Sequence, residues 1–322
     1  MNMKAPVGKT GDFFVKAVID VGTNSVKLLA AKFRSNNFNS DMEILADIVI
    51  VCRLGEGSGE IGVLTRGAME RTAAAIRQLC AEARRLDAHN IIAVGTQALR
   101  KASNAGEFIR LVEDTCGVRI RVVSGEEEAG LSFAAALSAV GDVSHGEILV
   151  LDVGGGSSEV VGARGGTIMC RESVPVGALS LYNKFFTSPD GVISDEALNE
   201  VGRYIGMMFA DTVARDFGFE NAPSCVGIGG TITTLAAVSV ARGGEGAGVG
   251  GLTLEVSEIE RQISMYAKAD IMTRNKIPGL PAERADIILP GACIVRSFML
   301  MSNLDKIIVC GRGLRHGLML LA

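Results

Sequence analysis

The sequence contains no tryptophan, and aromatic residues make up only 5% of its 322 residues. It has neither a GxSxG motif nor a GxxxxGK[ST] motif, which disfavours serine hydrolases and P-loop NTPases. The three histidines share no metal-binding spacing. The seven cysteines form no CxxC pair, so a zinc finger is excluded and reduced thiols in a cytoplasmic protein are expected.

The chain also lacks a strong charge of either sign, since its formal net charge is −4. A protein without an excess of basic residues is not expected to bind a nucleic acid backbone nonspecifically. Residues 221–241 carry no charge, a length that reaches the span of a bilayer. However, Pro223 and the glycines of 227–230 predict a strand, a turn and a helix there. We therefore expect neither a nucleic acid partner nor a membrane partner.

Glycine is abundant, with 40 residues, and hydrophobic residues reach 48%. The clearest pattern is a repeat in which the hairpin expected over 18–29 recurs over 150–161, with Asp, Val, Gly and Ser at matching places. Chance similarity of two hairpins is the alternative. Strands alternate with amphipathic helices, such as those predicted over 66–86 and 195–215. The pattern predicts a duplicated α/β fold with mixed sheets in two lobes and a cleft between them.

The two hairpin turns are candidate phosphate and metal sites. Glycines 154–156 expose main-chain N–H groups, and Ser157 and Ser158 add hydroxyls, which suits a phosphate. A second glycine turn, Gly229 and Gly230, precedes Thr231. The alternative is that these glycines only make tight turns.

Acidic residues stand beside the hairpin turns. Asp20 and Asp152 each precede a turn, and Glu159 follows the second one. Because Mg²⁺ binds one or two carboxylates together with phosphate oxygens and water, these three residues form the predicted metal site, with Glu159 either as a direct ligand or as a carboxylate behind the ligands.

The triplet Glu126, Glu127 and Glu128 begins a helix predicted over 126–140. Ser124 and Glu127 fit a capping box, and Glu126 suits the helix dipole. Glu128 is left over and lies on the apolar face, so it is a candidate general base for a water. The alternative is that all three carboxylates simply suit the start of a helix.

Several basic residues lie near the predicted turns, namely Lys27, Arg53, Arg100, Lys101 and Arg284. Arginine binds two phosphate oxygens through its planar fork, so we prefer Arg53 and Arg100 as phosphate contacts.

Together these motifs resemble the exopolyphosphatase / guanosine pentaphosphate phosphatase family, within the actin, Hsp70 and sugar-kinase superfamily. The resemblance runs nearly the whole chain and rests on residues 19–25, 53–57, 96–100, 124–129, 152–159, 229–231, 283–286 and 313–315. The Ser-Gly-x-Glu-Glu-Ala segment narrows the match from the superfamily to these phosphatases. The chain stops after the helix predicted over 314–321, so it resembles the short form of the family.

The resemblance implies a two-lobed actin-like (ribonuclease H-like, duplicated) fold that holds phosphates and Mg²⁺ between its lobes. Residues 1–128 with 310–322 would form the first lobe, and residues 129–309 the second. The family's catalytic glutamate falls on Glu128, and its metal-associated acids fall on Asp152 and Glu159. The phosphate-binding residues expected from the matched motifs are Asn24, Ser25, Arg53, Thr96, Arg100, Gly154, Gly155, Gly156, Ser157, Ser158, Gly229, Gly230, Thr231 and Arg284.

The function expected first is release of terminal orthophosphate from polyphosphate by Mg²⁺-dependent water attack. Guanosine pentaphosphate is the alternative substrate, because it ends in the same phosphoanhydride. A nucleotide- or alarmone-sensing module without turnover and a small-molecule kinase are further alternatives. A homodimer is the oligomer to test.

Overall fold

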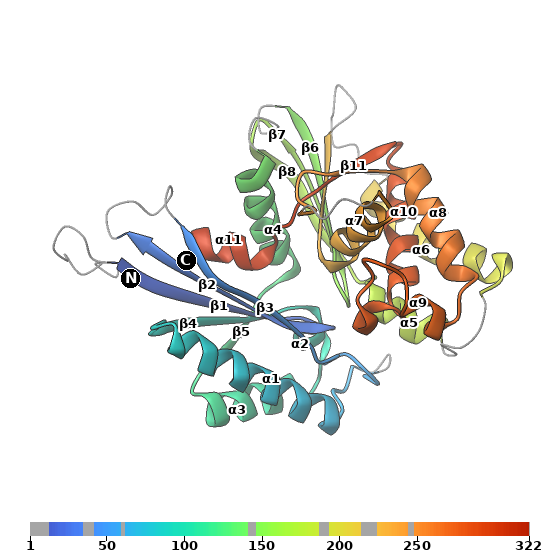
Figure 1. Ribbon diagram of the computed structural model, residues 1–322. Coiled ribbons are helices and arrows are strands. Elements are labelled where there is room, and N and C mark those ends of the chain that lie inside the picture. Colours follow the sequence, from blue (N-terminus) through green and yellow to red (C-terminus); the bar gives the residue numbers. More distant parts are fainter. Residues whose placement is uncertain are drawn as a thin grey trace.

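The computed structural model describes residues 13–34, 42–58, 62–140, 146–186, 193–213, 224–243 and 248–321. Two β-sheets with helices packed on them form the two lobes seen in Figure 1. Strand order is β3-β2-β1-β4-β5 in the first sheet and β10-β11-β9-β6-β7-β8 in the second. Both sheets mix parallel and antiparallel pairs, which confirms the predicted α/β class.

The strands of the first sheet are β1 (Phe13–Val21), β2 (Ser25–Arg34), β3 (Glu43–Val51), β4 (Asn90–Gly95) and β5 (Ile120–Val122). Those of the second are β6 (Glu147–Val153), β7 (Ser158–Arg164), β8 (Thr167–Val174), β9 (Ser224–Ile228), β10 (Thr253–Glu255) and β11 (Lys306–Val309). The helices are α1 (Arg66–Arg85), α2 (Gln97–Lys101), α3 (Ala105–Cys116), α4 (Gly125–Val140), α5 (Ala178–Phe185), α6 (Asp195–Val213), α7 (Gly230–Gly243), α8 (Val256–Ala267), α9 (Ile271–Arg274), α10 (Ile288–Met301) and α11 (Leu314–Leu321), with a 3-10 turn, η2, at Ala282–Arg284.

Each lobe is a sheet covered by helices on both faces. In the first lobe, α1 and α3 pack on one face. The other face packs against α11, through Val18 and Leu29 of the sheet and Leu318 of the helix. In the second lobe, α4 covers one face, and α5, α6, α7, α8 and α10 lie on the other. Helices α4 and α11 contact each other and lie between the two sheets (Figure 1).

The repeated hairpins predicted from the sequence are the β1–β2 and β6–β7 pairs. Successive side chains of a strand face opposite sides of the sheet. In β1, Ile19 packs toward α1 while Val18 packs toward α11, so Asp20 also faces the layer between the lobes. In β6, Val150 packs toward α4, which places Asp152 on that same inner side. The duplication therefore directs one aspartate from each lobe toward the interlobe layer.

The closing helix α11 packs on β1 and β2 of the first sheet, although it follows the last strand of the second. Helix α4 packs on β6, β7, β8 and β9. The lobe boundaries given above, at residues 128 and 310, stay a prediction.

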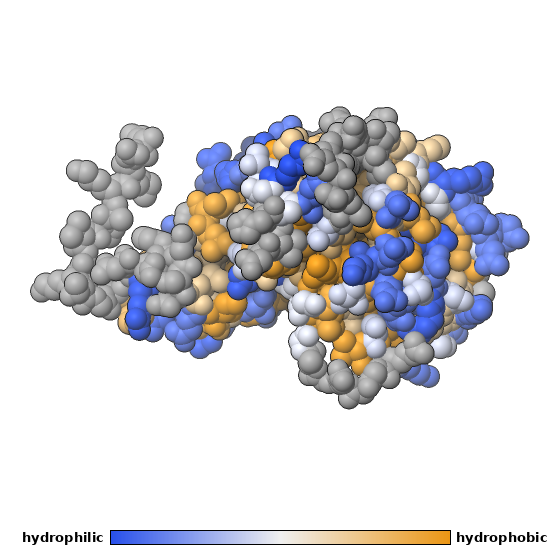
Figure 2. Space-filling view, turned by 90° about the horizontal axis from the view of Figure 1, so that it is seen from above, coloured by the Kyte–Doolittle hydropathy of each residue, from blue (hydrophilic) through white to orange (hydrophobic). Residues whose placement is uncertain are grey.

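The described part of the chain has no helix of the length and hydropathy needed to cross a bilayer. Residues 224–228 form β9 and residues from Gly230 form α7, as predicted for the uncharged stretch. Residues 221–223 lie outside the described residues. Figure 2 shows hydrophilic residues interspersed with hydrophobic ones over the upper face.

Candidate functional site

A cavity of about 430 Å³ lies between the lobes and is lined by both hairpin turns. Most of the residues predicted from the sequence line it. They are Asp20, Asn24, Ser25, Thr96, Glu128, Asp152, Gly154, Gly155, Gly156, Ser157, Glu159, Gly229, Gly230, Thr231 and Arg284.

In the second hairpin turn, the N–H of Gly154 donates to the Ser157 carbonyl at 3.0 Å, while those of Gly155 and Gly156 point away from α5. The carbonyl of Gly154 accepts from Ala178 N at 2.9 Å, and that of Gly155 accepts from Leu179 N at 2.9 Å, so the first turn of α5 takes up both oxygens. In a trans peptide the C=O and the following N–H point in opposite directions. The amides of Gly155 and Gly156 therefore face away from α5, and both residues line the cavity. Such amides suit an anion.

The two hairpin turns touch each other. A Cβ on Gly156 would stand 2.4 Å from Thr23 Oγ1, and one on Gly155 would stand 2.9 Å from Asn24 Cβ. The side-chain oxygens Thr23 Oγ1 and Asn24 Oδ1 are buried, and no residue in the described ranges forms a hydrogen bond with them. Glycine is thus needed here for contact between the lobes, and unpaired oxygens lie at that contact.

Glu128 faces inward, as predicted, with an exposed fraction of 8%. Ser124 Oγ accepts from Glu127 N at 3.1 Å, which caps α4, while the Glu127 carboxylate bonds Arg121 at 2.6 Å instead of closing the predicted capping box. Burial, opposed by Arg100, raises the pKa of Glu128 to about 7, and the nearby charges of Asp20 and Asp152 act in the same direction as burial.

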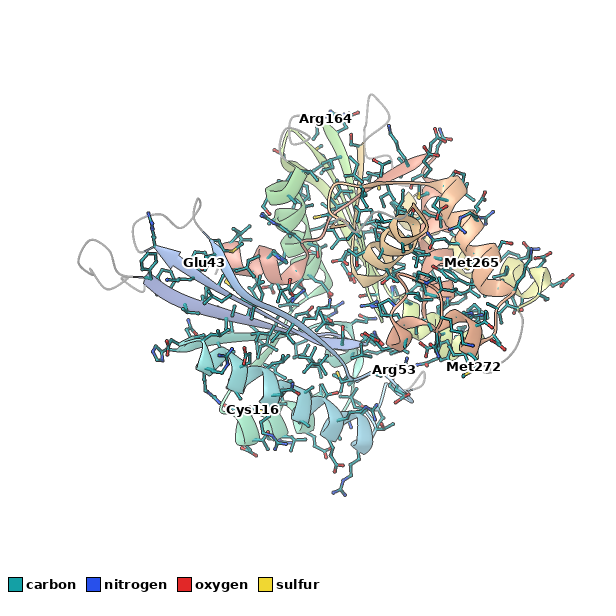
Figure 3. The ribbon with its side chains drawn as sticks, in the orientation of Figure 1. Glu43, Arg53, Cys116, Arg164, Met265 and Met272 are labelled. Carbon is teal, nitrogen blue, oxygen red and sulfur yellow. The ribbon has the colours of Figure 1, made fainter. Side chains whose placement is uncertain are left out.

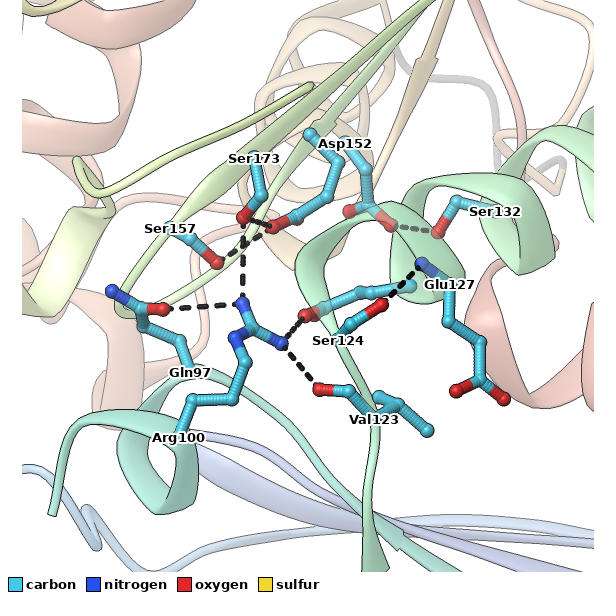
Figure 4. A network of polar contacts seen from close by, with 11 residues as sticks. Gln97, Arg100, Val123, Ser124, Glu127, Ser132, Asp152, Ser157 and Ser173 are labelled. Atoms are coloured by element: carbon cyan, nitrogen blue, oxygen red, sulfur yellow. Dashed lines mark hydrogen bonds and ion pairs between the residues drawn. The ribbon is translucent and has the colours of Figure 1, made fainter. Parts of the chain in front are cut away.

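Arg100 joins the candidate base to the second lobe (Figure 4). Its Nη1 donates to Glu128 Oε2 at 2.5 Å and to the Val123 carbonyl at 3.2 Å. Its Nη2 donates to Gln97 at 3.1 Å and to Ser173 Oγ, on β8, at 3.4 Å. The guanidinium therefore fixes the Glu128 carboxylate relative to both lobes.

Two of the three predicted metal ligands, Asp20 and Glu159, are buried carboxylates, and the third, Asp152, is half-buried. Asp152 and Glu159 are cross-strand partners in the β6–β7 hairpin. Burial raises the pKa of both groups, and other carboxylates add to the rise: Asp20 for Asp152, and Glu128 and Asp152 for Glu159. Asp20 Oδ1 is buried and has no hydrogen-bond partner among the described residues, although the other oxygen, Oδ2, lies 3.5 Å from Lys27 Nζ.

These oxygen donors fit a hard divalent cation, which would offset the repulsion between them. Within the described ranges, no three His, Cys, Asp or Glu side chains come close enough to form a complete protein metal site. Mg²⁺ commonly binds only one or two carboxylates and takes its other ligands from water and phosphate. The donor set therefore suits Mg²⁺ better than a metal that needs a full protein cage.

Arg284 presents a cation to the cavity. Its guanidinium lies against Gly230, where a Cβ would stand 2.1 Å from Nη2. Among the residues that the structure describes, no hydrogen bond or ion pair engages this guanidinium. Burial lowers its pKa below the usual value of an arginine. An unpaired arginine at a cavity wall is suited to bind a phosphate.

Three residues predicted to bind phosphate lie elsewhere. Arg53 does not line the cavity but forms an ion pair with Asp286. Arg100 is bonded to Glu128 and likewise does not line the cavity. Ser158 points to the opposite face of its sheet from Glu159, and its Oγ donates to the Val176 carbonyl at 2.7 Å. Strand alternation, which sequence reasoning did not apply here, accounts for Ser158.

The structure adds polar groups that sequence reasoning did not select. Lys27 lines the cavity because it is the cross-strand partner of Asp20. Ser132 Oγ donates to Asp152 Oδ2 at 2.6 Å from the inner face of α4, one turn beyond Glu128. Ser157 and Ser173 each donate to Glu159 Oε1 at 2.7 Å. Ser132 stands four residues after Glu128, and this spacing could have predicted that both side chains lie on the same face of the helix.

Comparison with known proteins finds a match to the model of the Ppx/GppA phosphatase family over residues 33–321. A putative exopolyphosphatase of Haemophilus influenzae is 27% identical over 301 residues, covering 94% of this chain and 89% of that protein. A guanosine-5'-triphosphate,3'-diphosphate pyrophosphatase of Vibrio cholerae is 28% identical over 302 residues, covering 94% of this chain. The chain spans 58% of that protein's length and 46% of another matched relative's.

Among solved structures, the Aquifex aeolicus member of the Ppx/GppA family superposes with a TM-score of 0.75 at 26% identity. The superposition covers 96% of this chain and 97% of that one.

Proposed function

This chain belongs to the Ppx/GppA phosphatase family, and on that premise we propose that it releases terminal orthophosphate from inorganic polyphosphate. The observation that carries the proposal is Glu128, a buried carboxyl with a pKa raised to about 7 in a cavity that also holds anion-binding groups. A base whose pKa lies near neutrality can accept a proton at the pH where the reaction runs.

In the proposed mechanism, Glu128 takes a proton from a water aligned with the terminal phosphorus. The water oxygen forms the new P–O bond while the bridging oxygen leaves with the shortened chain. Phosphoryl transfer depends mainly on positioning and on electrostatic stabilisation, so no covalent nucleophile is required. Arg100 holds the Glu128 carboxylate in place and keeps its pKa from rising further.

The terminal phosphate would bind between the two hairpin turns. The amides of Gly155 and Gly156 and the Arg284 guanidinium supply the main donors. The remaining groups proposed for this role are Asn24, Ser25, Thr96, Gly154, Ser157, Gly229, Gly230 and Thr231, all of which line the cavity. Arg53, Arg100 and Ser158 are left out of this set because they do not line the cavity.

We further propose that one or two of the carboxylates of Asp20, Asp152 and Glu159 would hold Mg²⁺, with water and phosphate oxygens as its other ligands. Bound there, the cation would offset negative charge on the transferred group. The unpartnered Asp20 Oδ1 and the raised pKa values of Asp152 and Glu159 support this assignment. Ser132, Ser157 and Ser173 would orient the carboxylates through the hydrogen bonds described above.

A second candidate function is the 5'-phosphohydrolysis of guanosine pentaphosphate. The cavity is larger than a terminal phosphate requires, and part of its wall is apolar, with Val49, Val51 and Leu314. A nucleoside would use that apolar part, and the Vibrio cholerae relative carries such an activity in its name. A sensor without turnover is the third reading, and the inward-facing Glu128 speaks against it. The homodimer and the cytoplasmic location stay predictions.

The test is orthophosphate release from long polyphosphate, short polyphosphate and guanosine pentaphosphate in parallel, each with Mg²⁺ and with chelator. We expect the highest kcat/KM on polyphosphate, and only with the metal. Preference for guanosine pentaphosphate would support the second candidate. Tight nucleotide binding without release from any substrate would support the sensor.

A further inference from the structure

Arg53 and Asp286 connect the two lobes at one side of the cavity. Nη1 of Arg53 lies 2.6 Å from Asp286 Oδ2, and Nη2 donates to Asp286 Oδ1 at 2.9 Å. Nη2 also lies 3.3 Å from the carbonyl oxygen of Glu283. The pair is half-buried, with side-chain exposed fractions of 23% and 12%. Figure 3 shows Arg53 where the first lobe faces the second. Paired N–H···O bonds of this kind fix orientation as well as distance.

The first-lobe end of this contact is held by the hairpin turn that lines the cavity. Arg53 has a positive φ of 52°, and its N–H donates to the Asn24 carbonyl at 2.8 Å. Gly55 N donates to the Thr23 carbonyl at 3.0 Å. The Arg53 backbone therefore moves with the turn that touches Gly155 and Gly156.

In the second lobe, the two residues that Arg53 contacts lie on either side of Arg284 in the sequence. Arg53 bonds the residue before it, through the Glu283 carbonyl, and Asp286, which lies two residues after it. Arg284 itself lies against Gly230 and lines the cavity with a guanidinium that no described residue engages. The direction of the Arg284 side chain therefore depends on the short 3-10 turn, which Arg53 contacts from the opposite lobe.

From this arrangement we infer that Arg53 is a positioning residue that, through Asp286, directs Arg284 onto the substrate's phosphates when the lobes are closed. The inference rests on the proposed function, which assigns Arg284 to phosphate binding. The role differs from the one predicted from the sequence, because Arg53 acts here through another arginine and does not itself touch phosphate. Losing the pair would weaken substrate binding without removing the base.

The experiment is a double-mutant cycle with tripolyphosphate as substrate, using Arg53→Gln, Arg284→Gln and the double variant. Arg53→Gln should raise KM about tenfold with kcat changed less than about twofold, since uniform binding is lost. In the Arg284→Gln background, Arg53→Gln should add less than about a twofold further rise, because coupled residues are not additive. Asp286→Asn should reproduce the effect of Arg53→Gln. Arg53→Lys, which keeps the charge but not the fork, should fall between Arg53→Gln and the wild type.

The matched control is Arg296→Gln, which breaks the 2.9 Å pair with Glu260 inside the second lobe and should leave KM unchanged. Equal KM increases from Arg53→Gln in both backgrounds would overturn the inference. So would a lower melting temperature with unchanged KM, which is the result of a purely structural pair.

A readout that does not need turnover separates this inference from the proposed function. The amides of Arg284 and Ile287 are hydrogen-bonded within the 3-10 turn and the start of α10. Their hydrogen exchange should be faster in Arg53→Gln and unchanged in Arg296→Gln. If no oligophosphate is hydrolysed, the proposed function fails, while unchanged exchange in Arg53→Gln would refute the positioning role.

Discussion

The Arg100 guanidinium lies 2.5 Å from the Glu128 carboxylate and also reaches Ser173, on a strand of the opposite lobe. The cation and the carboxyl that it holds come from α2 and α4, which are separated by β5 and α3 in the chain. The two lobes therefore meet at the arginine that holds the candidate base.

The first prediction concerns pH. Burial raises the pKa of Glu128 to about 7, and Arg100 counteracts that rise. A base must be deprotonated to act, so kcat should increase as pH rises through the pKa of Glu128. In Arg100→Gln this pKa is higher, and the increase should move to higher pH. The measurement is kcat against pH with saturating tripolyphosphate and Mg²⁺. Arg100→Lys keeps a cation and should shift the profile less, whereas an unshifted profile in Arg100→Gln would contradict this electrostatic role.

The second prediction concerns the contact between the hairpin turns. In Gly156→Ala, the new methyl would stand 2.4 Å from Thr23 Oγ1 and 2.8 Å from Gln97 Cγ. Overpacking of this kind costs about 1–3 kcal/mol and would push the turns apart. Phosphate release should fall at least about tenfold while the far-UV circular dichroism is retained. Gly202→Ala, on α6 with open space around its Cα, is the matched control and should keep full activity. Equal activity of both variants would show that the turns need not touch.

The third prediction concerns stability at low pH. His316 is 3% exposed, and burial, aided by the Arg315 charge, lowers its pKa from 6.5 to about 4. The unfolded chain therefore binds a proton below pH 6.5 that the folded chain refuses until about pH 4. The contribution of neutral His316 to the free energy of unfolding is complete above pH 6.5. It falls by about 3 kcal/mol as the pH drops from 6.5 to about 4.

This loss can be measured by urea unfolding at neutral pH and at a pH of about 4.5. Asparagine can still accept the hydrogen bond that His316 Nδ1 receives from Gly313 N–H at 3.2 Å. His316→Asn should lose about 2–3 kcal/mol less than the wild type between the two pH values. Equal losses in the two proteins would exclude His316 as a source of the acid sensitivity.

Much of the fold and part of the site follow from the sequence. The repeated Asp-Val-Gly turns predicted where Asp20 and Asp152 lie, because two copies of one hairpin direct the matching side chain to the same side of their sheets. The helix over 314–321 was predicted with its observed bounds. The helix predicted over 195–215 is described to Val213, and its last residues lie outside the described ones. Helix α10 was not predicted, since it is buried nearly throughout and lacks an amphipathic stripe.

The partners of the arginines could not be read from the sequence. Arg53 and Asp286 are 233 positions apart, and the pairing of a long side chain depends on how the lobes close. The motifs identify the arginines, but they do not show whether a guanidinium binds a phosphate or a carboxylate. Within the described part of the chain, Arg284 forms no ion pair, so its cation stays available, which only the packed structure reveals.

The fourth prediction concerns the metal. The buried carboxylates repel one another, so a bound divalent cation should stabilise the folded state. The melting temperature should be higher with Mg²⁺ than with chelator, and Asp152→Asn should lose most of that difference. Glu126→Gln, which removes an exposed carboxylate paired with Arg171, should keep it. An equal effect of Mg²⁺ on the wild type and on Asp152→Asn would place the cation elsewhere.

The central claim is tested most directly by single-turnover phosphate release from polyphosphate by Glu128→Gln beside the wild type, with Mg²⁺ at neutral pH. Glutamine keeps the size of the side chain and can still accept from Arg100, but it cannot take a proton from water. The account predicts a rate lower by about 10²–10⁴-fold with substrate binding retained. Release at close to the wild-type rate would contradict the assignment of Glu128 as the base.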